Sequence, residues 1–464
     1  MLFSSYAFIV IFLPAVVLGY YALALLGGRT AALTFLVLAS FAFYASWNAA
    51  YLALLLASIG FNYLIARRLT SDEPHRRRWL IAGIVANLAL LGYYKYAAFF
   101  LDIVAPGYTI EAIVLPLGIS FFTFQQIMFL TDLYKGGQRG FGLRYYAASV
   151  SFFPHLIAGP IVPYRELMPQ FANSSRIEVP WDQIAPGLLL FSLGLAKKVL
   201  LADPLSEPVA RVFDAAAGGE SIARIDAWGG ALAYTFQLYF DFSGYTDMAL
   251  GLGHLFGIRL PVNFMSPYKA RSIAEFWRRW HITLSNFLRD HLYIPLGGNR
   301  GSQARTARNL LLTMGLGGLW HGAGWTFIVW GLMHGAYLVV HRLWSANGRQ
   351  IPALLAWALT FLAVVAGWVM FRAHSVEAAV SLYSAMIGGA ADPTRLLGRD
   401  TFGHIGLLAI IAFFAPNTIE WVRGTASHPS RFRASWPYAA VAIMLLLAST
   451  LNLHRVSEFL YFNF

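Results

Sequence analysis

The sequence predicts an all-α membrane protein whose helices cross the bilayer many times. Hydrophobic residues make up 58% of its 464 positions and charged residues only 12%, about half the share of roughly 25% that is typical of soluble domains. Apolar windows recur along the chain, and about 20 such residues suffice to span a bilayer core. The alternating pattern of a membrane β-barrel does not occur. A polytopic helical protein is therefore expected.

We expect ten crossing helices and a pair of short segments within 309–341. The first apolar stretch has no positive residues before it and continues past any cleavage point, which favours a retained helix over a signal peptide. Residues 152–160 are broken by Pro and Gly and are expected to be re-entrant or interfacial. Without a soluble domain or repeat, residues 1–464 are interpreted as one membrane domain. The expected crossings are 5–26, 31–47, 49–66, 79–100, 112–133, 183–202, 228–257, 351–373, 402–422 and 436–453.

Lysine and arginine are distributed unevenly between the connections. If the N-terminus is outside, the connections on the cytoplasmic side hold 25 of the 34 Lys and Arg residues, and those on the opposite side hold five. The positive-inside rule then places both termini on the periplasmic side of a bacterial inner membrane. The net charge of +12 is informative through this distribution, and no nucleic-acid partner is expected.

A histidine among glycines and indoles is the first candidate site residue. His321 follows Trp320 within an otherwise apolar run, and an ionisable group at membrane depth points to function. A neutral imidazole, with an ordinary pKa of ~6.5, suits a general base. The alternative is a buried histidine bonded to a carbonyl between helices. The nearby glycines permit either a broken helix or close packing; they are Gly315, Gly317, Gly318, Gly322 and Gly324.

A second histidine follows a tryptophan in the basic segment 258–309, which holds nine Lys and Arg residues against two acids. Apolar residues from Phe276 to His291 recur at near-helical spacing and predict one amphipathic helix in the membrane plane. On this helix His281 is either an interfacial snorkelling residue or a partner of His321. As a partner it would orient the acceptor or polarise a carbonyl.

Other side chains of this segment have two interpretations each. Trp277 and Trp280 are interfacial aromatics or walls of an acyl-sized cavity. The basic charge follows from topology, or it attracts a phosphate-bearing cytosolic donor. The candidates for donor binding are Arg278, Arg279, Asn299 and Arg300.

Two acids, Asp241 and Asp247, stand in an apolar crossing, where such residues usually face a bundle interior or a wet cavity. Structural pairing of these acids with Arg271 or Arg278 explains their presence as well as direct catalysis does.

No metal site is expected, although the chain has 12 histidines. No H-E-x-x-H pattern occurs, and His334 and His341 are two helical turns apart, too far for simple shared ligation. The chain has no cysteine, which excludes disulfides and an acyl-cysteine intermediate within it.

Together these residues resemble the signature segments of the membrane-bound O-acyltransferase family, in its bacterial branch that O-acetylates alginate, cellulose or peptidoglycan. The segments are 240–245 (Phe-Asp-Phe-Ser-Gly-Tyr), 276–281 (Phe-Trp-Arg-Arg-Trp-His) and 319–322 (Leu-Trp-His-Gly). The resemblance covers nearly the whole chain. It implies that His321 is the catalytic histidine and His281 the family's second characteristic histidine. It also implies a ring of tilted helices around a tunnel, lined by Trp277, Trp280, Trp320, Asp241, Ser243 and Tyr245.

The resemblance further implies a reaction and its partners. Acetyl-CoA is the cytoplasmic donor, no metal takes part, and the acetyl group crosses the inner membrane to an exported polysaccharide. The implied partners are a periplasmic SGNH-type acetyltransferase, the polysaccharide-export machinery and membrane lipid. An acyltransferase directed at lipid or protein remains an alternative. A transporter or flippase is a further one, although inverted repeats typical of transporters are not visible.

The C-terminal motif 459–464 begins Phe-Leu-Tyr-Phe. It resembles the Phe-x-Tyr-Phe ending of a small peptide in the teichoic-acid D-alanylation system, whose tyrosine is proposed to carry the acyl group. This resemblance implies that His321 deprotonates Tyr461, which then carries the acetyl group. Aromatic anchoring at the outer interface is the alternative.

Overall fold

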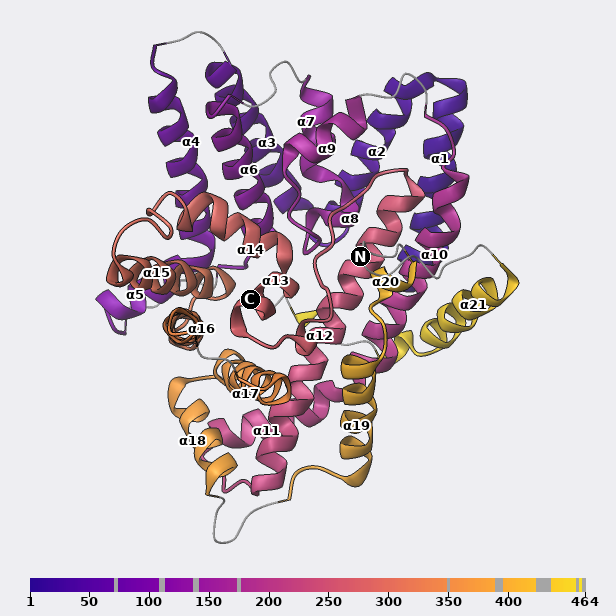
Figure 1. The fold of residues 1–464 in the computed structure, drawn as a ribbon. Helices are drawn as coiled ribbons and strands as arrows, with labels where there is room; N and C mark the ends of the chain where they lie inside the picture. The colour runs from indigo at the N-terminus through magenta and orange to yellow at the C-terminus, as the bar shows by residue number, and fades with distance from the viewer. Residues whose placement is uncertain are drawn as a thin grey trace. The chain divides into compact units, whose positions relative to one another are not determined.

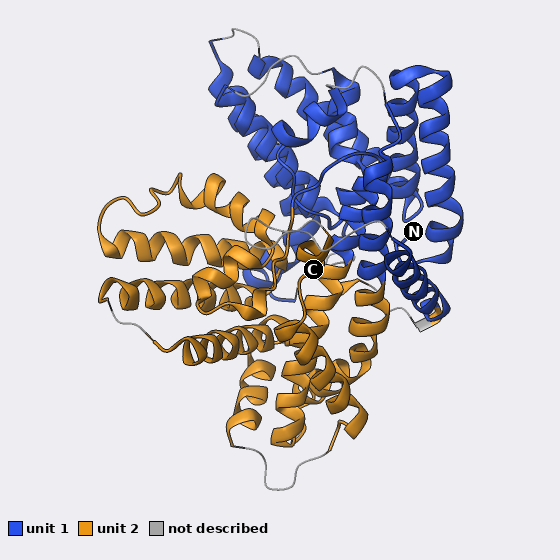
Figure 2. Ribbon diagram, turned by 45° about the vertical axis from the view of Figure 1, so that its right-hand side comes forward, with its two compact units in different colours: residues 1–195, 245–261, 432–453 blue, residues 196–244, 262–431, 454–464 orange. Residues whose placement is uncertain are grey.

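The regular structure of the described residues is helical, and no strand occurs among them (Figure 1). The computed structural model describes residues 1–70, 74–107, 113–136, 142–172, 177–348, 351–388, 395–422, 435–455 and 459–460. Contacts divide the chain into unit 1 (1–195, 245–261 and 432–453) and unit 2 (196–244, 262–431 and 454–464) (Figure 2). The predicted all-α class is confirmed.

Unit 1 consists mainly of the N-terminal helices, joined by one helix from near the C-terminus. Its elements are η1 (Ala7–Phe12), α1 (Leu13–Leu26), α2 (Gly28–Ala45), α3 (Ala49–Thr70), α4 (Arg76–Leu91), η2 (Gly92–Tyr96), α5 (Ala97–Val104), α6 (Ile119–Tyr134), α7 (Leu143–Ser151), α8 (Phe153–Leu156), α9 (Tyr164–Ala172), α10 (Trp181–Ala196) and α21 (Trp436–Leu451).

A reciprocal amide pair connects α3 and α4 inside unit 1. Asn87 Nδ2 donates to Asn62 Oδ1 at 2.7 Å, and Asn62 Nδ2 donates to Asn87 Oδ1 at 3.3 Å. Both side chains are buried. Because hydrocarbon offers no other hydrogen-bond partner, such polar pairs hold membrane helices together.

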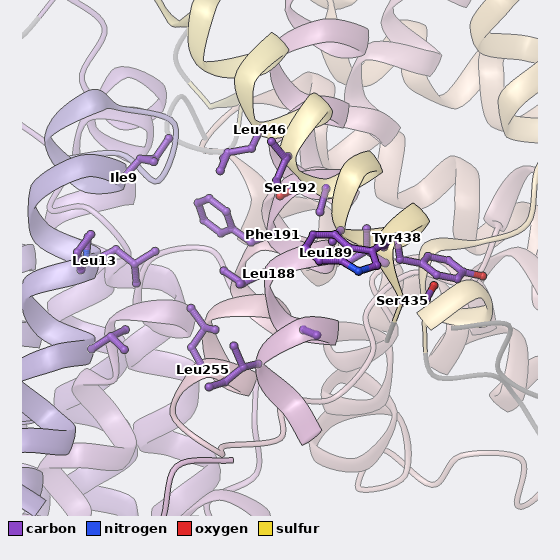
Figure 3. Close-up of a pocket in the computed structure, with 18 residues that line it drawn as sticks. Ile9, Leu13, Leu188, Leu189, Phe191, Ser192, Leu255, Ser435, Tyr438 and Leu446 are labelled. Atoms are coloured by element: carbon purple, nitrogen blue, oxygen red, sulfur yellow. The ribbon is translucent and has the colours of Figure 1, made fainter. Parts of the chain in front are cut away.

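Unit 1 also contains an apolar cavity of about 860 Å³, shown in Figure 3. Side chains from α1, α10 and α21 line it, among them Leu13, Leu188 and Leu446. Its few polar groups include Ser192, Ser435 and Tyr438. No histidine, carboxylate, lysine or arginine lines it, so this cavity offers no general acid or base.

Unit 2 contains the two histidine motifs. Its elements are η3 (Lys197–Ala202), η4 (Asp203–Leu205), α11 (Ser206–Ala217), α12 (Arg224–Leu255), η5 (Pro267–Lys269), α13 (Ile273–Arg279), α14 (Ile282–Leu288), η6 (Arg289–Tyr293), α15 (Gln303–His321), α16 (Trp325–Ala346), α17 (Ala353–Arg372), α18 (Val376–Ile387), α19 (Arg399–Phe414), α20 (Thr418–Val422) and η7 (Leu453–Arg455). The division between the units falls within α12, after Gly244, and within η7, after Leu453.

Glycines let α15 and α16 approach closely. A Cβ added to Gly318 would lie 2.1 Å from the Phe327 carbonyl oxygen, and one added to Gly331 would lie 2.2 Å from the Met314 carbonyl oxygen. Both obstacles are backbone atoms of the facing helix, which cannot swing away as a side chain can. Close packing therefore requires glycine at these two positions.

Among the described residues, six helices are long and apolar enough to cross a membrane: Ala7–Leu26, Gly28–Ala45, Ala49–Thr70, Arg76–Val104, Trp181–Ala217 and Ala353–Arg372. Each matches an expected crossing, and helices also stand at the other expected positions. The pair expected within 309–341 extends beyond that range as α15 and α16. The only helix within 152–160 is the four-residue α8, in line with the Pro and Gly residues there.

The expectation of one continuous amphipathic helix through His281 is wrong. The segment forms α13, α14 and η6, and His281 between the first two has φ 42°, in the left-handed region. Trp280 and His281 are buried, so His281 is not an exposed snorkelling residue. At this junction the backbone N–H groups of Ile282 and Thr283 donate to Asn263 instead of continuing the preceding helix.

Candidate active site

His321 is the last residue of α15, so the helix ends among the glycines for which the sequence allowed either a broken helix or close packing. Gly322 is extended, with φ −159°, and α16 begins at Trp325. The His321 side chain is 4% exposed. Its ring centroid lies 5.2 Å from that of Trp330 and 5.4 Å from that of Phe371. The histidine therefore projects from a helix end into an aromatic environment.

His281 is fully buried at the junction of α13 and α14. Its Nδ1 lies 3.2 Å from Asn263 Oδ1, which also accepts from the Thr283 backbone N–H at 3.1 Å. The backbone N–H can only donate, so the accepting atom of Asn263 is its oxygen. The Nδ1 of His281 must then donate, and the neutral ring has its lone pair on Nε2.

Burial lowers the pKa of His281 to about 3. This residue lies outside the six helices that are long and apolar enough to cross a membrane. At neutral pH its imidazole is therefore uncharged, which agrees with the tautomer set by Asn263. Nothing in the sequence patterns marked Asn263, because its partners come from 18 and 20 residues away.

The structure brings the two predicted histidines together in unit 2. Their ring centroids are 6.5 Å apart. Trp320 lies beside both, with its centroid 4.9 Å from that of His321 and 6.2 Å from that of His281. Two imidazole rings at this separation can contact the same bound group.

Tryptophans surround the histidines. The centroid of Trp368 lies 4.9 Å from that of Trp280 and 5.7 Å from that of Trp330. Trp277 packs against Trp330 at 5.9 Å. The sequence left Trp277 and Trp280 open between interface and cavity wall. The structure places Trp280 in this buried cluster and Trp277, partly exposed, at its edge.

A third histidine belongs to the same cluster. The His334 ring centroid is 5.0 Å from that of Trp330 and 5.2 Å from that of Trp277. The side chain is fully buried, and neither ring nitrogen has a hydrogen-bond partner in the part of the chain that the structure describes. From the sequence, His334 was a candidate only for metal binding. Its place in the cluster depends on how α13, α16 and α17 pack.

Asp241 pairs with a lysine rather than with Arg271 or Arg278, the partners considered from the sequence. Lys198 Nζ lies 2.6 Å from Asp241 Oδ1 and 2.7 Å from Asp203 Oδ1, and all three side chains are buried. Lys198 was not among the site residues predicted from the sequence. Its position could have marked it, because a lysine within an apolar crossing requires an anionic partner.

The Asp241 motif, residues 240–245, contains the point after Gly244 at which the chain passes from unit 2 to unit 1. Ser243 is buried in unit 2. Tyr245 belongs to unit 1, where its ring stacks on Phe3 with centroids 4.9 Å apart. Tyr245 therefore packs against the N-terminal end of the chain and does not join the two histidines of unit 2.

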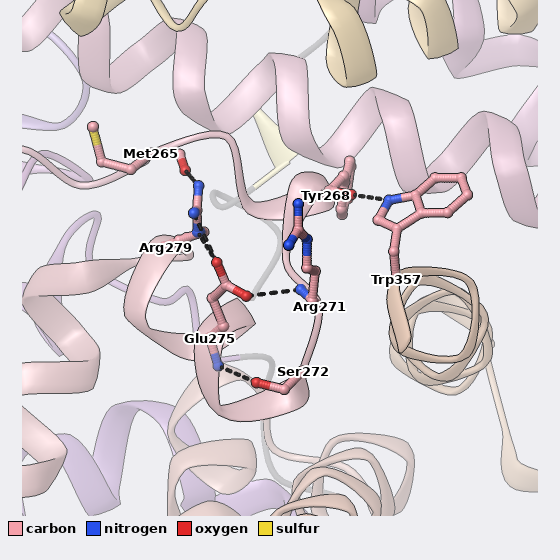
Figure 4. Close-up of polar contacts among 7 residues, drawn as sticks. All are labelled: Met265, Tyr268, Arg271, Ser272, Glu275, Arg279 and Trp357. Carbon is pink, nitrogen blue, oxygen red and sulfur yellow. Dashed lines mark hydrogen bonds and ion pairs between the residues drawn. The ribbon is translucent and has the colours of Figure 1, made fainter. Parts of the chain in front are cut away.

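Two of the four donor-binding candidates are engaged in local contacts. Arg279 Nη2 lies 2.7 Å from Glu275 Oε1, and its Nη1 donates to the Met265 carbonyl (Figure 4). Asn299 Oδ1 accepts from Arg342 Nη1 at 3.1 Å. Arg278 and Arg300 are exposed. Exposure leaves these last two accessible to an anion.

Glu275 organises the start of α13. Burial raises the pKa of this carboxyl, but the hydrogen bond from the Arg271 backbone N–H and the Arg279 guanidinium outweigh it, so the net pKa is lowered. Ser272 caps the helix by accepting the Glu275 backbone N–H at 3.1 Å (Figure 4).

No group of three or more metal-ligating side chains occurs in the described ranges. Tyr461 lies outside those ranges, and the C-terminal residues that the structure does describe are Phe459 and Leu460.

The fold is that of a polytopic membrane protein, with helices long and apolar enough to cross a bilayer. Its candidate site is a pair of histidines buried inside the protein. The model of the MBOAT, membrane-bound O-acyltransferase family matches residues 140–380. This match contains both histidines and the Asp241 motif. The chain belongs to this family and is an O-acyltransferase.

Two named relatives match the full length of this chain, and a third matches about half of it. Peptidoglycan O-acetyltransferase of Helicobacter pylori is 41% identical over 100% of this chain and 98% of its own. Probable alginate O-acetylase AlgI of Pseudomonas syringae is 39% identical over 100% of both. Teichoic acid D-alanyltransferase of Streptococcus thermophilus is 28% identical over 51% of this chain and 59% of its own. Acyl transfer is common to all three names.

Proposed function

We propose that this protein takes an acetyl group from cytoplasmic acetyl-CoA and delivers it across the bacterial inner membrane for O-acetylation of an exported polysaccharide. A periplasmic SGNH-type acetyltransferase would complete the transfer, and both termini would face the periplasm. The full-length similarity to an alginate O-acetylase and a peptidoglycan O-acetyltransferase supports an acetyl group and a glycan acceptor.

The proposed reaction runs through His321 and Tyr461. Neutral His321 accepts the phenolic proton of Tyr461, and the phenolate oxygen attacks the thioester carbonyl carbon. The carbon–sulfur bond breaks, and coenzyme A leaves as a thiolate that takes the proton from His321. Tyr461 then carries the acetyl group as an aryl ester, which the periplasmic enzyme transfers to the glycan hydroxyl.

His281 would orient the group that reacts. Its Nδ1 donates to Asn263, so Nε2 can accept a hydrogen bond but cannot donate one while the ring is neutral. Of the two roles considered for His281, this favours orienting a hydroxyl over polarising a carbonyl.

The observation that carries the proposal is the proximity of two buried histidines, 6.5 Å apart in a tryptophan cluster. The test is acetyl transfer from labelled acetyl-CoA by purified protein with candidate periplasmic partners. His321→Ala should lower the rate by about 10²–10⁴-fold, as loss of a general base does, while the protein stays folded and inserted. Wild-type turnover by this variant would refute the role of His321.

Tyr461→Phe tests the carrier separately. It removes one hydroxyl and keeps the aromatic ring that an interfacial anchor would need. Loss of acetylation in cells is expected from this variant. Full acetylation would exclude Tyr461 as the carrier but would leave direct activation of an acceptor by His321 intact.

A further inference from the structure

The C-terminal segment contacts α12 at two consecutive residues of the Asp241 motif. The Leu460 backbone N–H donates to Asp241 Oδ2 at 3.1 Å. The Phe459 ring lies against the Phe242 ring with centroids 5.9 Å apart, and Phe459 is buried. Both contacts lie within unit 2. Neighbouring residues of the motif thus hold neighbouring residues of the C-terminal segment.

The same contacts lead to the candidate active site. The Phe242 ring meets the His281 ring edge to face, with centroids 4.8 Å apart. Phe242 therefore contacts Phe459 and also His281. Tyr461 follows Leu460 directly in the sequence. Phe459 and Leu460 are thus held on α12 at and next to Phe242, the residue that contacts His281.

Lys198 determines how Asp241 presents its oxygens. Oδ1 of Asp241 is 2.6 Å from Lys198 Nζ, which is also 2.7 Å from Asp203 Oδ1. Oδ2 is the oxygen that accepts the Leu460 N–H. Burying one cation between two carboxylates is costly, and intramembrane charges usually serve function. A charged acceptor also makes a stronger hydrogen bond to a backbone N–H than a neutral one does.

We propose that Asp241, oriented by Lys198, is a positioning residue that docks the C-terminal segment beside His281 for acyl transfer. The role in transfer rests on the proposed function, in which Tyr461 is the carrier. The docking itself rests only on the contacts of Phe459 and Leu460. On this proposal Asp241 holds the C-terminal segment in place and takes no direct part in catalysis.

The absence of cysteine from the natural chain permits a clean accessibility test in the full-length protein. Leu460→Cys keeps the backbone N–H that Asp241 accepts and introduces the only thiol. Maleimide labelling in membranes should be about tenfold or more faster when Asp241→Ala is added, because a charge-assisted hydrogen bond is lost. Asp241→Asn retains an acceptor oxygen and should restore part of the protection.

Asp203→Asn is the matched control. It alters the same ion cluster but leaves the Asp241 oxygen that accepts the Leu460 N–H. Labelling should then stay within about twofold of the parent. If Asp241→Ala misfolds, Phe459→Ala replaces it, since this change removes the ring contact with Phe242 without disturbing a buried charge. Equal acceleration by the control and by Asp241→Ala would indicate general loosening and overturn the docking.

Acetylation in cells is measured on the same variants without the reporter cysteine. Asp241→Ala should lower it in step with the loss of protection, and Asp241→Asn should recover part of both. Unchanged labelling in Asp241→Ala and Phe459→Ala would overturn the docking, and full acetylation despite rapid labelling would overturn the positioning role. Full acetylation by Tyr461→Phe with protection intact would refute the carrier instead, so the two failures are distinguishable.

Discussion

Substitution of Asn263 tests most directly what fixes the tautomer of His281. Its Oδ1 accepts from His281 Nδ1 at 3.2 Å, from the Thr283 backbone N–H at 3.1 Å and from Thr283 Oγ1 at 3.0 Å. In Asn263→Ala, the two nitrogen donors lose their acceptor in a buried position, while the hydroxyl can rotate. At roughly 1–3 kcal/mol for each buried unsatisfied donor, the variant should lose about 2–6 kcal/mol of stability and most of its activity.

Asn263→Asp separates charge from hydrogen bonding. The carboxylate still accepts the three bonds, but an adjacent negative charge raises a histidine pKa by roughly 1–3 units. The pKa of His281, about 3 in the wild type, should therefore rise to about 4–6. Since the neutral ring is the active form, the variant should lose activity relative to wild type as the pH falls below about 6.

The assay is acetyl transfer between pH 5 and 8, expressed as the ratio of variant to wild type, so that titration of other groups cancels. Thermal unfolding in detergent measures the stability loss. A flat ratio for Asn263→Asp, together with wild-type stability and rate for Asn263→Ala, would refute the argument that Asn263 sets the His281 tautomer.

Gly331→Ala should destabilise the α15–α16 pair by about 1–3 kcal/mol, the usual cost of overpacking. Gly403→Ala should not, because an added Cβ there meets no neighbouring atom within 4 Å outside its own stretch of helix. Thermal unfolding compares the two variants. Asn62→Leu should cost about 1–3 kcal/mol because the buried Oδ1 of Asn87 loses the donor that Asn62 supplies. Adding Asn87→Leu should recover much of this. A double variant that loses more stability than the two single variants together would contradict this interaction between the two amides. Glu275→Gln should lower the unfolding midpoint modestly at pH 7. Because the folded pKa of Glu275 is lowered, that difference should disappear as the pH falls through it, and a pH-independent difference would exclude the ion pair as its cause.

Much of the helical framework could be predicted because apolar windows of membrane length are a strong signal. The break after His321 was also predictable, since Gly322 and Gly324 permit it. The break at His281 was not. Neither glycine nor proline marks it, and the backbone N–H groups that follow His281 bond to Asn263, 18 residues earlier in the chain.

The partners of the site residues were harder to predict than the residues themselves. Asp241 is paired with Lys198, a residue that no sequence pattern singled out. No sequence pattern around Asn263 points to its role, because the groups that donate to its side chain, in His281 and Thr283, are 18 and 20 residues away. Sequence patterns identify which groups can perform chemistry, whereas tertiary packing decides which atom of each group faces which neighbour.

The continuity of α12 has a consequence for how this motif can change. At 1.5 Å per residue, its 32 residues form a rod about 48 Å long. It holds Asp241 and Phe242 for one unit and Tyr245 for the other. Each inserted or deleted residue would turn everything beyond it by about 100°. Substitutions within the motif can therefore be tested one at a time, whereas an insertion or deletion between Phe242 and Tyr245 would change which sides of the helix these two residues occupy.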